Sequence, residues 1–147
     1  MKTRKDAGID IVVRLVRKAE SVDLAFVVDS TSSMGLYICL VKQSIKKIVQ
    51  RIPSTNKGLQ LRLAMVGYRD YHDVKRYETL DFTSSVGAFQ SFLANLKAVG
   101  GNDEPEDMAG GIQKANELSC SQTTRVTLLI ADSPCHGSEV RNYDDDE

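Results

Sequence analysis

The sequence feature that most restricts the possible folds of this chain is a pair of short apolar runs. Each of them ends in an aspartate. They are VDLAFVVD at 22–29 and RVTLLIAD at 125–132. Nearly continuous apolar runs of this length are typical of strands that are buried on both faces, as in parallel sheets. Such strands need helices above and below them, so the two runs indicate a layered α/β protein.

The rest of the chain supplies helices and further strands. Apolar residues recur at helical spacing in 8–20, 36–52, 85–97 and 107–119, which predicts amphipathic helices there. Two further strands are predicted at 59–68 and 76–82, and the second is short and polar, as edge strands are. Strands that alternate with helices in this way predict an open, mainly parallel α/β sheet.

Composition narrows the classes of partner. The 147 residues are 41% hydrophobic and 27% charged, with a formal net charge of −1. This balance gives no electrostatic reason to expect nucleic acid or a membrane surface as partner, and no apolar run reaches the roughly 18 residues of a membrane span. The three cysteines have no disulfide-framework spacing, which predicts reduced thiols and a cytoplasmic protein.

The stretch DSTSS, residues 29–33, follows the first apolar run and carries the most chemistry. Alternate side chains of an extended turn share a direction, so we expect Asp29, Thr31 and Ser33 to converge. One carboxylate and two hydroxyls form a hard oxygen set that suits Mg²⁺, Mn²⁺ or Ca²⁺. The alternative is that Ser32 or Ser33 only caps the following helix.

The second aspartate at a strand end strengthens the metal hypothesis. In open α/β sheets, ligands bind beyond the carboxyl ends of the strands, so Asp132 and Asp29 are expected at one crevice. A lone carboxylate at the end of a buried strand is costly, and a cation between the two aspartates would remove that cost.

An acidic loop, VGGNDEPEDMAGG at 99–111, is the third element. Asn102 and Asp103 come directly after two glycines and are the best candidates to reach the crevice. The later acids of the loop, including Asp107, serve equally well as a solvated segment at a helix N-terminus.

Two further segments are expected at the rim. In GYRDYHD at 67–73, Arg69 and Tyr71 could contact a partner, because exposed aromatic residues mark interfaces. A plain polar loop with an Arg–Asp pair is the alternative. In SPCHG at 133–137, His136 is expected as a rim or turn residue, since the side chains of neighbours such as Cys135 and His136 usually point apart and no acid is specified to orient the histidine for catalysis.

Through these motifs, the chain resembles the von Willebrand factor type A domains that carry a metal-ion-dependent adhesion site. DSTSS resembles the first motif of that site, and YRDY, GGNDEPED and IADSPCHG resemble the type A domains attached to alpha-kinases. The resemblance implies a Rossmann-like three-layer open sheet over 22–140, mainly parallel with one antiparallel edge strand and flanked by helices. A helical extension at 1–21 and an acidic tail at 141–147 flank it. It also implies Mg²⁺ or Mn²⁺ held directly by Thr31 and Ser33, and through waters by Asp29 and Asp132.

The sequence departs from this family in two respects. The second-loop threonine is missing, and Asn102 or Asp103 stands in its place; an aspartate bound directly there would hold the cation more tightly but weaken its attraction for a partner's carboxylate. Family domains also continue through another helix, strand and helix, whereas this chain stops at Glu147. Either the domain is abbreviated at its C-terminal side, or the chain is part of a longer protein with a kinase or other domain.

The resemblance implies a metal-dependent protein-binding module of adhesion or scaffold type, and we predict that it is not an enzyme. One alternative is a phosphoryl-transfer enzyme of the haloacid dehalogenase type, with Asp29 as nucleophile and Thr31 and Asp132 beside Mg²⁺. That family needs an acid where this chain has Thr31, which cannot transfer a proton. The other alternative is a type A domain that binds partners through its rim loops without metal.

Overall fold

The computed structural model describes residues 4–17, 19–101 and 107–132. Its elements are, in chain order, α1 (Arg4–Val16), β1 (Ser21–Asp29), the short 3-10 helix η1 (Ser32–Leu36), α2 (Ile38–Thr55), β2 (Gln60–Tyr68), β3 (Tyr77–Thr83), α3 (Val86–Asn95), α4 (Met108–Asn116) and β4 (Thr124–Ile130). Strands and helices follow one another in the predicted order.

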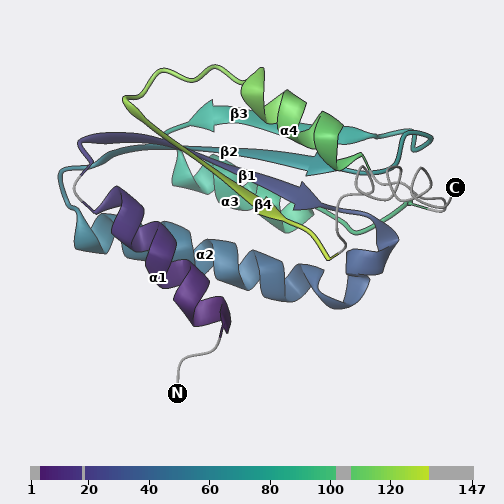
Figure 1. Ribbon diagram of the computed structural model, residues 1–147, viewed down its shortest axis with the longest axis horizontal. Helices are drawn as coiled ribbons and strands as arrows, with labels where there is room; N and C mark the ends of the chain where they lie inside the picture. The colour runs from purple at the N-terminus through teal and green to yellow at the C-terminus, as the bar shows by residue number, and fades with distance from the viewer. Residues whose placement is uncertain (1–3, 18, 102–106, 133–147) are drawn as a thin grey trace, which may run out of the picture.

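The four described strands form one sheet in the order β3-β2-β1-β4. β1 is parallel to β2 and β4, whereas β3 runs antiparallel to β2, as the arrows in Figure 1 show. The prediction of an open, mainly parallel sheet with one antiparallel edge strand is therefore confirmed. Because β1 lies between parallel neighbours, with Asp29 beside Tyr68 and Val28 beside Ile130, three strands end at the same edge.

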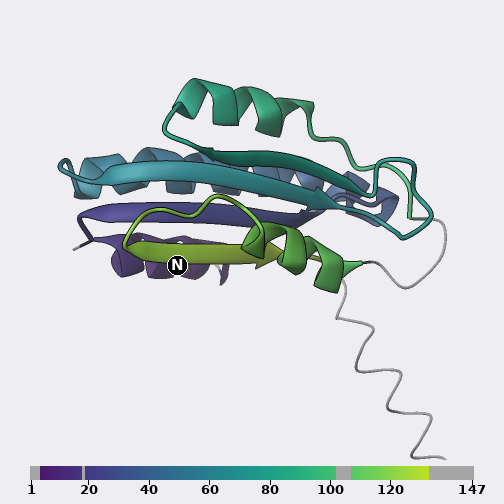
Figure 2. The same cartoon turned by 90° about the horizontal axis from the view of Figure 1, so that it is seen from above.

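Helices cover both faces of this sheet (Figure 2). On one face, Phe26 and Val28 of β1 share a core with α1, α2 and α3. On the other face, Val27 packs in a smaller cluster with Ala115 of α4, and Figure 1 shows α4 on the opposite side of the sheet from α1 and α2. The alternation along β1 explains why its sequence is apolar at nearly every position.

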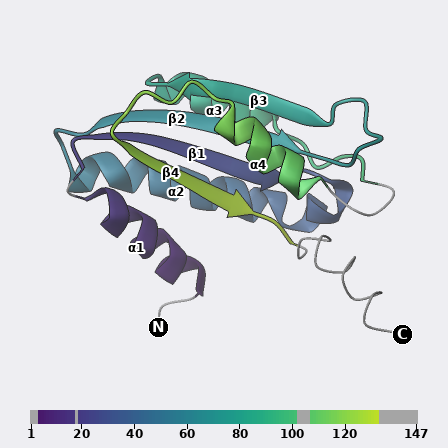
Figure 3. The same cartoon turned by 45° about the horizontal axis from the view of Figure 1, so that its top comes forward.

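The N-terminal helix belongs to the main core. The apolar stripe predicted on this helix is buried, and it consists of Ile9, Val12, Val13 and Val16. Figure 3 shows α1 beside α2 on the same side of the sheet. The region predicted as an extension thus contributes to the same core as β1. None of the helices in the described ranges combines the length and apolar character that a membrane crossing requires.

Two elements differ from the prediction. Helix α2 continues through Pro53 to Thr55 instead of ending before the proline; the hydroxyls of Ser54 and Thr55 donate to the carbonyls of Arg51 and Ile52, which complete the last turn. Strand β4 alternates between half-buried and exposed residues, so the expectation that it is buried on both faces is wrong. Among the described strands β4 lies at an edge of the sheet, where the helices do not enclose it.

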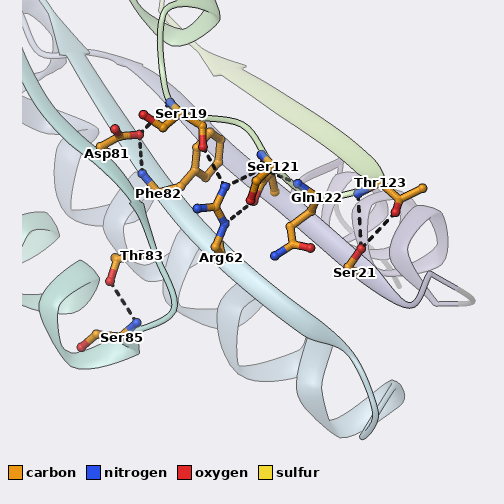
Figure 4. Close-up of polar contacts among 11 residues, drawn as sticks. Ser21, Arg62, Asp81, Phe82, Thr83, Ser85, Ser119, Ser121, Gln122 and Thr123 are labelled. Atoms are coloured by element: carbon orange, nitrogen blue, oxygen red, sulfur yellow. Dashed lines mark hydrogen bonds and ion pairs between the residues drawn. The ribbon is translucent and has the colours of Figure 1, made fainter.

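A polar network joins the strands where β1, β2 and β4 begin, at the end of the sheet opposite Asp29 (Figure 4). The buried Asp23 carboxylate accepts two hydrogen bonds from Arg62, both of 2.8 Å. It also accepts from the backbone N–H of Ser121 at 2.7 Å and of Gln122 at 3.1 Å. Burial acts to raise the pKa of Asp23, but these hydrogen bonds outweigh it and hold that pKa below its usual value of 3.8. The network fixes the segment that leads into β4.

Candidate functional site

The turn after β1 brings three oxygen-bearing side chains together. Both the backbone N–H and the hydroxyl of Thr31 donate to Asp29 Oδ1, at 2.9 Å and 2.6 Å. The Thr31 hydroxyl also lies 3.1 Å from the Ser33 hydroxyl. Asp29 and Thr31 are buried, whereas Ser33 is exposed, so the cluster extends from the interior to the surface.

The remaining hydroxyls of the turn serve other purposes. Ser30 is buried and donates to the Tyr68 carbonyl at 3.1 Å, while Ser32 is exposed and donates its backbone N–H to the Gly100 carbonyl at 3.0 Å. The expected alternation of side-chain directions is therefore present. Neither η1 nor α2 has a side-chain capping hydrogen bond, so the structure does not support the alternative that Ser32 or Ser33 caps the following helix.

The second strand-end aspartate lies at the same edge of the sheet. Asp132 follows two residues after the end of β4 and lines a cavity with Met34 of η1. It is exposed, so the argument that a buried carboxylate at this position requires a cation is wrong. The reason is that β4 lies at an edge and leaves the chain beyond it open to solvent. A role for Asp132 at a metal remains a prediction.

Gly100 and Gly101 belong to the predicted acidic loop, which is called the glycine loop below. They lie directly against the turn after β1. Val99 donates its N–H to the Ser30 carbonyl at 3.0 Å. Gly101 has φ +73°, and a Cβ built there would come within 2.7 Å of the Thr31 Cβ. Gly100 has φ +77°, and its Cβ would overlap the Asp73 carboxylate. Side chains are thus excluded at both positions by conformation and by space.

The two glycines that precede Asn102 and Asp103 therefore lie at the site, but three predicted residues lie outside the described ranges. They are Asn102, Asp103 and His136, and their roles stay predictions.

The loop after β2 divides into a buried and an exposed part. Arg69 is only 3% exposed, and its guanidinium donates to the Glu78 carboxylate at 2.8 Å. Because it is buried, the expectation that its side chain faces a partner at the rim is wrong; Arg69 holds the loop in place. Tyr71 is 50% exposed, and the Arg76 guanidinium lies 4.1 Å from the centre of its ring. A role for Tyr71 in partner binding remains a prediction.

A buried polar cluster surrounds Asp107 and was not predicted from the sequence. Asp107 is 2% exposed and caps α4 by accepting from the Gly110 N–H at 2.9 Å. It also accepts hydrogen bonds from Arg76 Nε, at 2.6 Å, and from the Tyr77 hydroxyl. The cap was predictable from local sequence, but the partners are some thirty residues away and no local signal points to them.

The charges of this cluster are mutually stabilised. Burial acts to raise the pKa of Asp107, yet the hydrogen bonds from Tyr77, Arg76 and Gly110 outweigh it and lower that pKa. Burial, together with the hydrogen bond to Asp107, raises the pKa of Tyr77 to about 12. The cluster therefore connects β3 to the start of α4 through polar groups that satisfy one another's hydrogen bonds and charges.

Comparison with known proteins identifies the family. The profile of the von Willebrand factor A domain matches residues 23–142, which include the Asp29 turn, the glycine loop and β4. The chain belongs to the von Willebrand factor A domain family.

Two relatives of this A domain are much longer than the chain itself. It is 34% identical over 145 residues to the alpha-protein kinase vwkA of Dictyostelium discoideum, which covers 97% of this chain and 23% of the kinase. It is 36% identical over 115 residues to the putative ariadne-like RING finger protein R811 of Acanthamoeba polyphaga mimivirus, covering 78% of this chain and 11% of that protein. The chain thus spans at most about a quarter of the length of these relatives.

Two solved structures share the fold of the A domain. The pilus adhesin SpaC of Lactobacillus rhamnosus GG, in an open conformation, superimposes with a TM-score of 0.65 at 17% identity, over 80% of this chain and 15% of the adhesin. An uncharacterised protein of Alicyclobacillus acidocaldarius gives a TM-score of 0.55 at 17% identity, over 97% of this chain and 52% of its own. At this identity the likeness establishes the α/β fold alone.

The residues at the Asp29 turn of this A domain suit a hard divalent cation. Within the described residues no group of three or more His, Cys, Asp or Glu side chains could hold a metal, so a cation here would depend on hydroxyl donors. Thr31 donates its proton to Asp29, so toward other groups its oxygen can act only as an acceptor. Together with Ser33 and the buried charge of Asp29, this forms the oxygen set that Mg²⁺, Mn²⁺ and Ca²⁺ prefer.

Proposed function

We propose that this A domain is a protein-binding module whose partner contact depends on a divalent cation held by Asp29, Thr31 and Ser33. The observation that carries the proposal is the convergence of these three side chains, with Thr31 Oγ1 2.6 Å from Asp29 Oδ1 and 3.1 Å from Ser33 Oγ. Family membership supports a binding module of adhesion or scaffold type. The cation and its effect on partner binding are our inference.

The three residues have different parts in the proposed site. Thr31 and Ser33 offer neutral oxygens, while Asp29 supplies one negative charge from the interior, so these three residues leave one positive charge of the cation uncompensated. Asp103 and Asp132 are the proposed additional acidic ligands, and an aspartate that binds directly would hold the cation more tightly but weaken its attraction for a partner's carboxylate. The bound cation, Mg²⁺, Mn²⁺ or Ca²⁺, would supply a Lewis acid that accepts a carboxylate oxygen of a partner protein.

The test is calorimetric titration of the metal-stripped chain with Mg²⁺, Mn²⁺ and Ca²⁺. Ser33→Ala removes one proposed donor at an exposed position, and Ser32→Ala is the matched control, because Ser32 belongs to the same turn and lies outside the cluster. We expect saturable binding that Ser33→Ala weakens by about tenfold or more and Ser32→Ala leaves unchanged. Absence of binding at millimolar cation, or equal effects of the two variants, would refute the metal site.

We further propose that the domain acts without catalysis, in the cytoplasm, and beside a kinase or other domain of a longer chain. The likeness to an alpha-protein kinase supports the last point, since this chain covers only 23% of that relative. The reduced thiols predicted from the cysteine pattern support the cytoplasmic location.

A further inference from the structure

A charged cleft lies next to the proposed metal site and has no part in it. Its volume is about 710 Å³, within the range of pockets that bind small ligands or side chains. Gly100 lines the cleft and packs against Asp73, whereas the adjacent Gly101 packs against Thr31. The glycine pair therefore contacts the cleft wall on one side and the metal-site turn on the other.

The buried Arg69 builds this cleft. Its guanidinium donates to the backbone carbonyls of Lys75 and of Lys97, both at 2.9 Å, so one group joins its own β2–β3 loop to the segment that follows α3. Both lysines line the cleft, and both are exposed. The backbones of two exposed lysines are thus held in place around one cavity.

The charged side chains that line the cleft favour a ligand with a single negative charge. The cleft is lined by three cations, Arg69, Lys75 and Lys97, and by two carboxylates, Asp73 and Glu78. Glu78 binds Arg69 at 2.8 Å and lies 3.7 Å from the Lys75 ammonium. Asp73 accepts from the N–H of Gly101 at 3.0 Å. One positive charge remains in excess.

The excess positive charge lies on Lys97. Within the part of the chain that the structure describes, the Lys97 ammonium makes no ion pair or hydrogen bond. Apolar surface borders it, because Val74 is fully exposed and Val99 is 49% exposed. The cleft thus offers one uncompensated cation next to two apolar contacts.

We propose that this cleft binds a carboxylate side chain of an acidic partner segment between Lys75 and Lys97, with the apolar neighbours of that residue on Val74 and Val99. A monoanion matches the single excess charge, whereas a phosphate dianion would also face the Asp73 and Glu78 carboxylates. The proposed contact needs no cation, so it goes beyond the metal-dependent function and can be tested apart from it.

The experiment is a titration of the ¹⁵N-labelled chain, followed by backbone amide shifts, in chelator and at low salt. Three probes have the same frame: acetyl-Gly-Val-Glu-Val-Gly-amide, its Gln analogue and its phosphoserine analogue. We expect saturable shifts at Lys75, Lys97 and Val99 with the Glu peptide, and at least threefold weaker binding of the other two. Lys97→Gln should weaken the Glu peptide about two- to fivefold, as loss of one exposed charge contact does.

The controls separate this inference from the metal proposal and from misfolding. Lys46→Gln removes an exposed lysine of α2 outside the cleft and should leave binding unchanged, while Lys97→Arg should retain it. Ser33→Ala should also bind the Glu peptide normally in chelator. The inference is overturned if the Glu and Gln peptides bind alike, if the phosphoserine peptide binds more tightly, or if Lys97→Gln and Lys46→Gln have equal effects; none of these outcomes bears on the metal site.

Discussion

Replacing Asp23 with Asn should destabilise the chain strongly, although Asp23 lies at the opposite edge of the sheet from the proposed site. Asp23 Oδ1 accepts from Arg62 Nε, whereas Oδ2 accepts from Arg62 Nη2 and from the N–H groups of Ser121 and Gln122. In Asp23→Asn, the amide oxygen can replace Oδ2 and keep three of these contacts. The amide NH₂ then faces Arg62 Nε, so a donor meets a donor.

The expected loss of stability follows from the charge partner that Arg62 loses in Asp23→Asn. Removing one partner of a buried ion pair costs about 3 to 5 kcal/mol. Asp23 is fully buried, but the Arg62 side chain is 22% exposed and keeps its contact with the Ser119 carbonyl at 2.8 Å. Water can therefore compensate part of its charge, and we expect a loss of about 2 to 4 kcal/mol in the free energy of unfolding.

Urea unfolding at neutral pH measures this loss. The matched control is Glu117→Gln, which removes the exposed Lys114–Glu117 pair with an N–O distance of 3.4 Å and should change stability by less than about 0.5 kcal/mol. If the two variants lie within about 0.5 kcal/mol of each other, the assignment of Asp23 as the central acceptor is refuted.

The pH dependence supplies an independent check on the same residue. Folding lowers the pKa of Asp23, so its stabilising contribution is complete above its unfolded pKa and is lost as the pH falls through the lower folded value. The difference in stability between the native chain and Asp23→Asn should therefore shrink below the usual aspartate pKa of 3.8. A difference that stays constant through this range would contradict the proposed origin of the stabilisation.

Three further predictions test other parts of the domain. Gly101→Ala should cost about 1 to 3 kcal/mol in urea unfolding, because of its positive φ and close packing, whereas Gly58→Ala, with open space around it, should be nearly neutral. Tyr77→Phe should cost about 1 to 2 kcal/mol through loss of the bond to Asp107. In the native chain that contribution should be lost as the pH rises through the Tyr77 pKa of about 12, which phenolate absorbance follows. Incubation with Mg²⁺ and a generic phosphate ester should give no turnover; turnover that Asp29→Asn abolishes would favour phosphoryl transfer instead.

Local sequence patterns predicted the strands and the turn at the proposed metal site, because both depend on neighbours in the chain. The direction of Asp29, Thr31 and Ser33 follows from the alternation of an extended backbone, and the apolar pattern of β1 follows from burial on both faces. The same pattern failed for β4, since an apolar run does not reveal whether a strand is central or at an edge. The exposure of Asp132 could not be inferred for that reason.

Contacts between distant segments were not predictable from the sequence. Asp107 looked like one acid among several in a solvated loop, and only the fold places Arg76 and Tyr77 against it. Arg69 looked like a rim residue, because a charged side chain in a polar loop is usually exposed. Its burial depends on the carbonyl group of Lys75 in the same loop, but also on the carbonyl group of Lys97 and on Glu78 of β3, and no pattern within the loop records these last two.

The same tertiary contacts connect the loops at the site into one unit. The turn after β1 binds the glycine loop through the bond from the Ser32 N–H to the Gly100 carbonyl, and the glycine loop binds the β2–β3 loop through the bond from the Gly101 N–H to Asp73. Any shift of the glycine loop must therefore change contacts at both the Thr31 turn and the cleft.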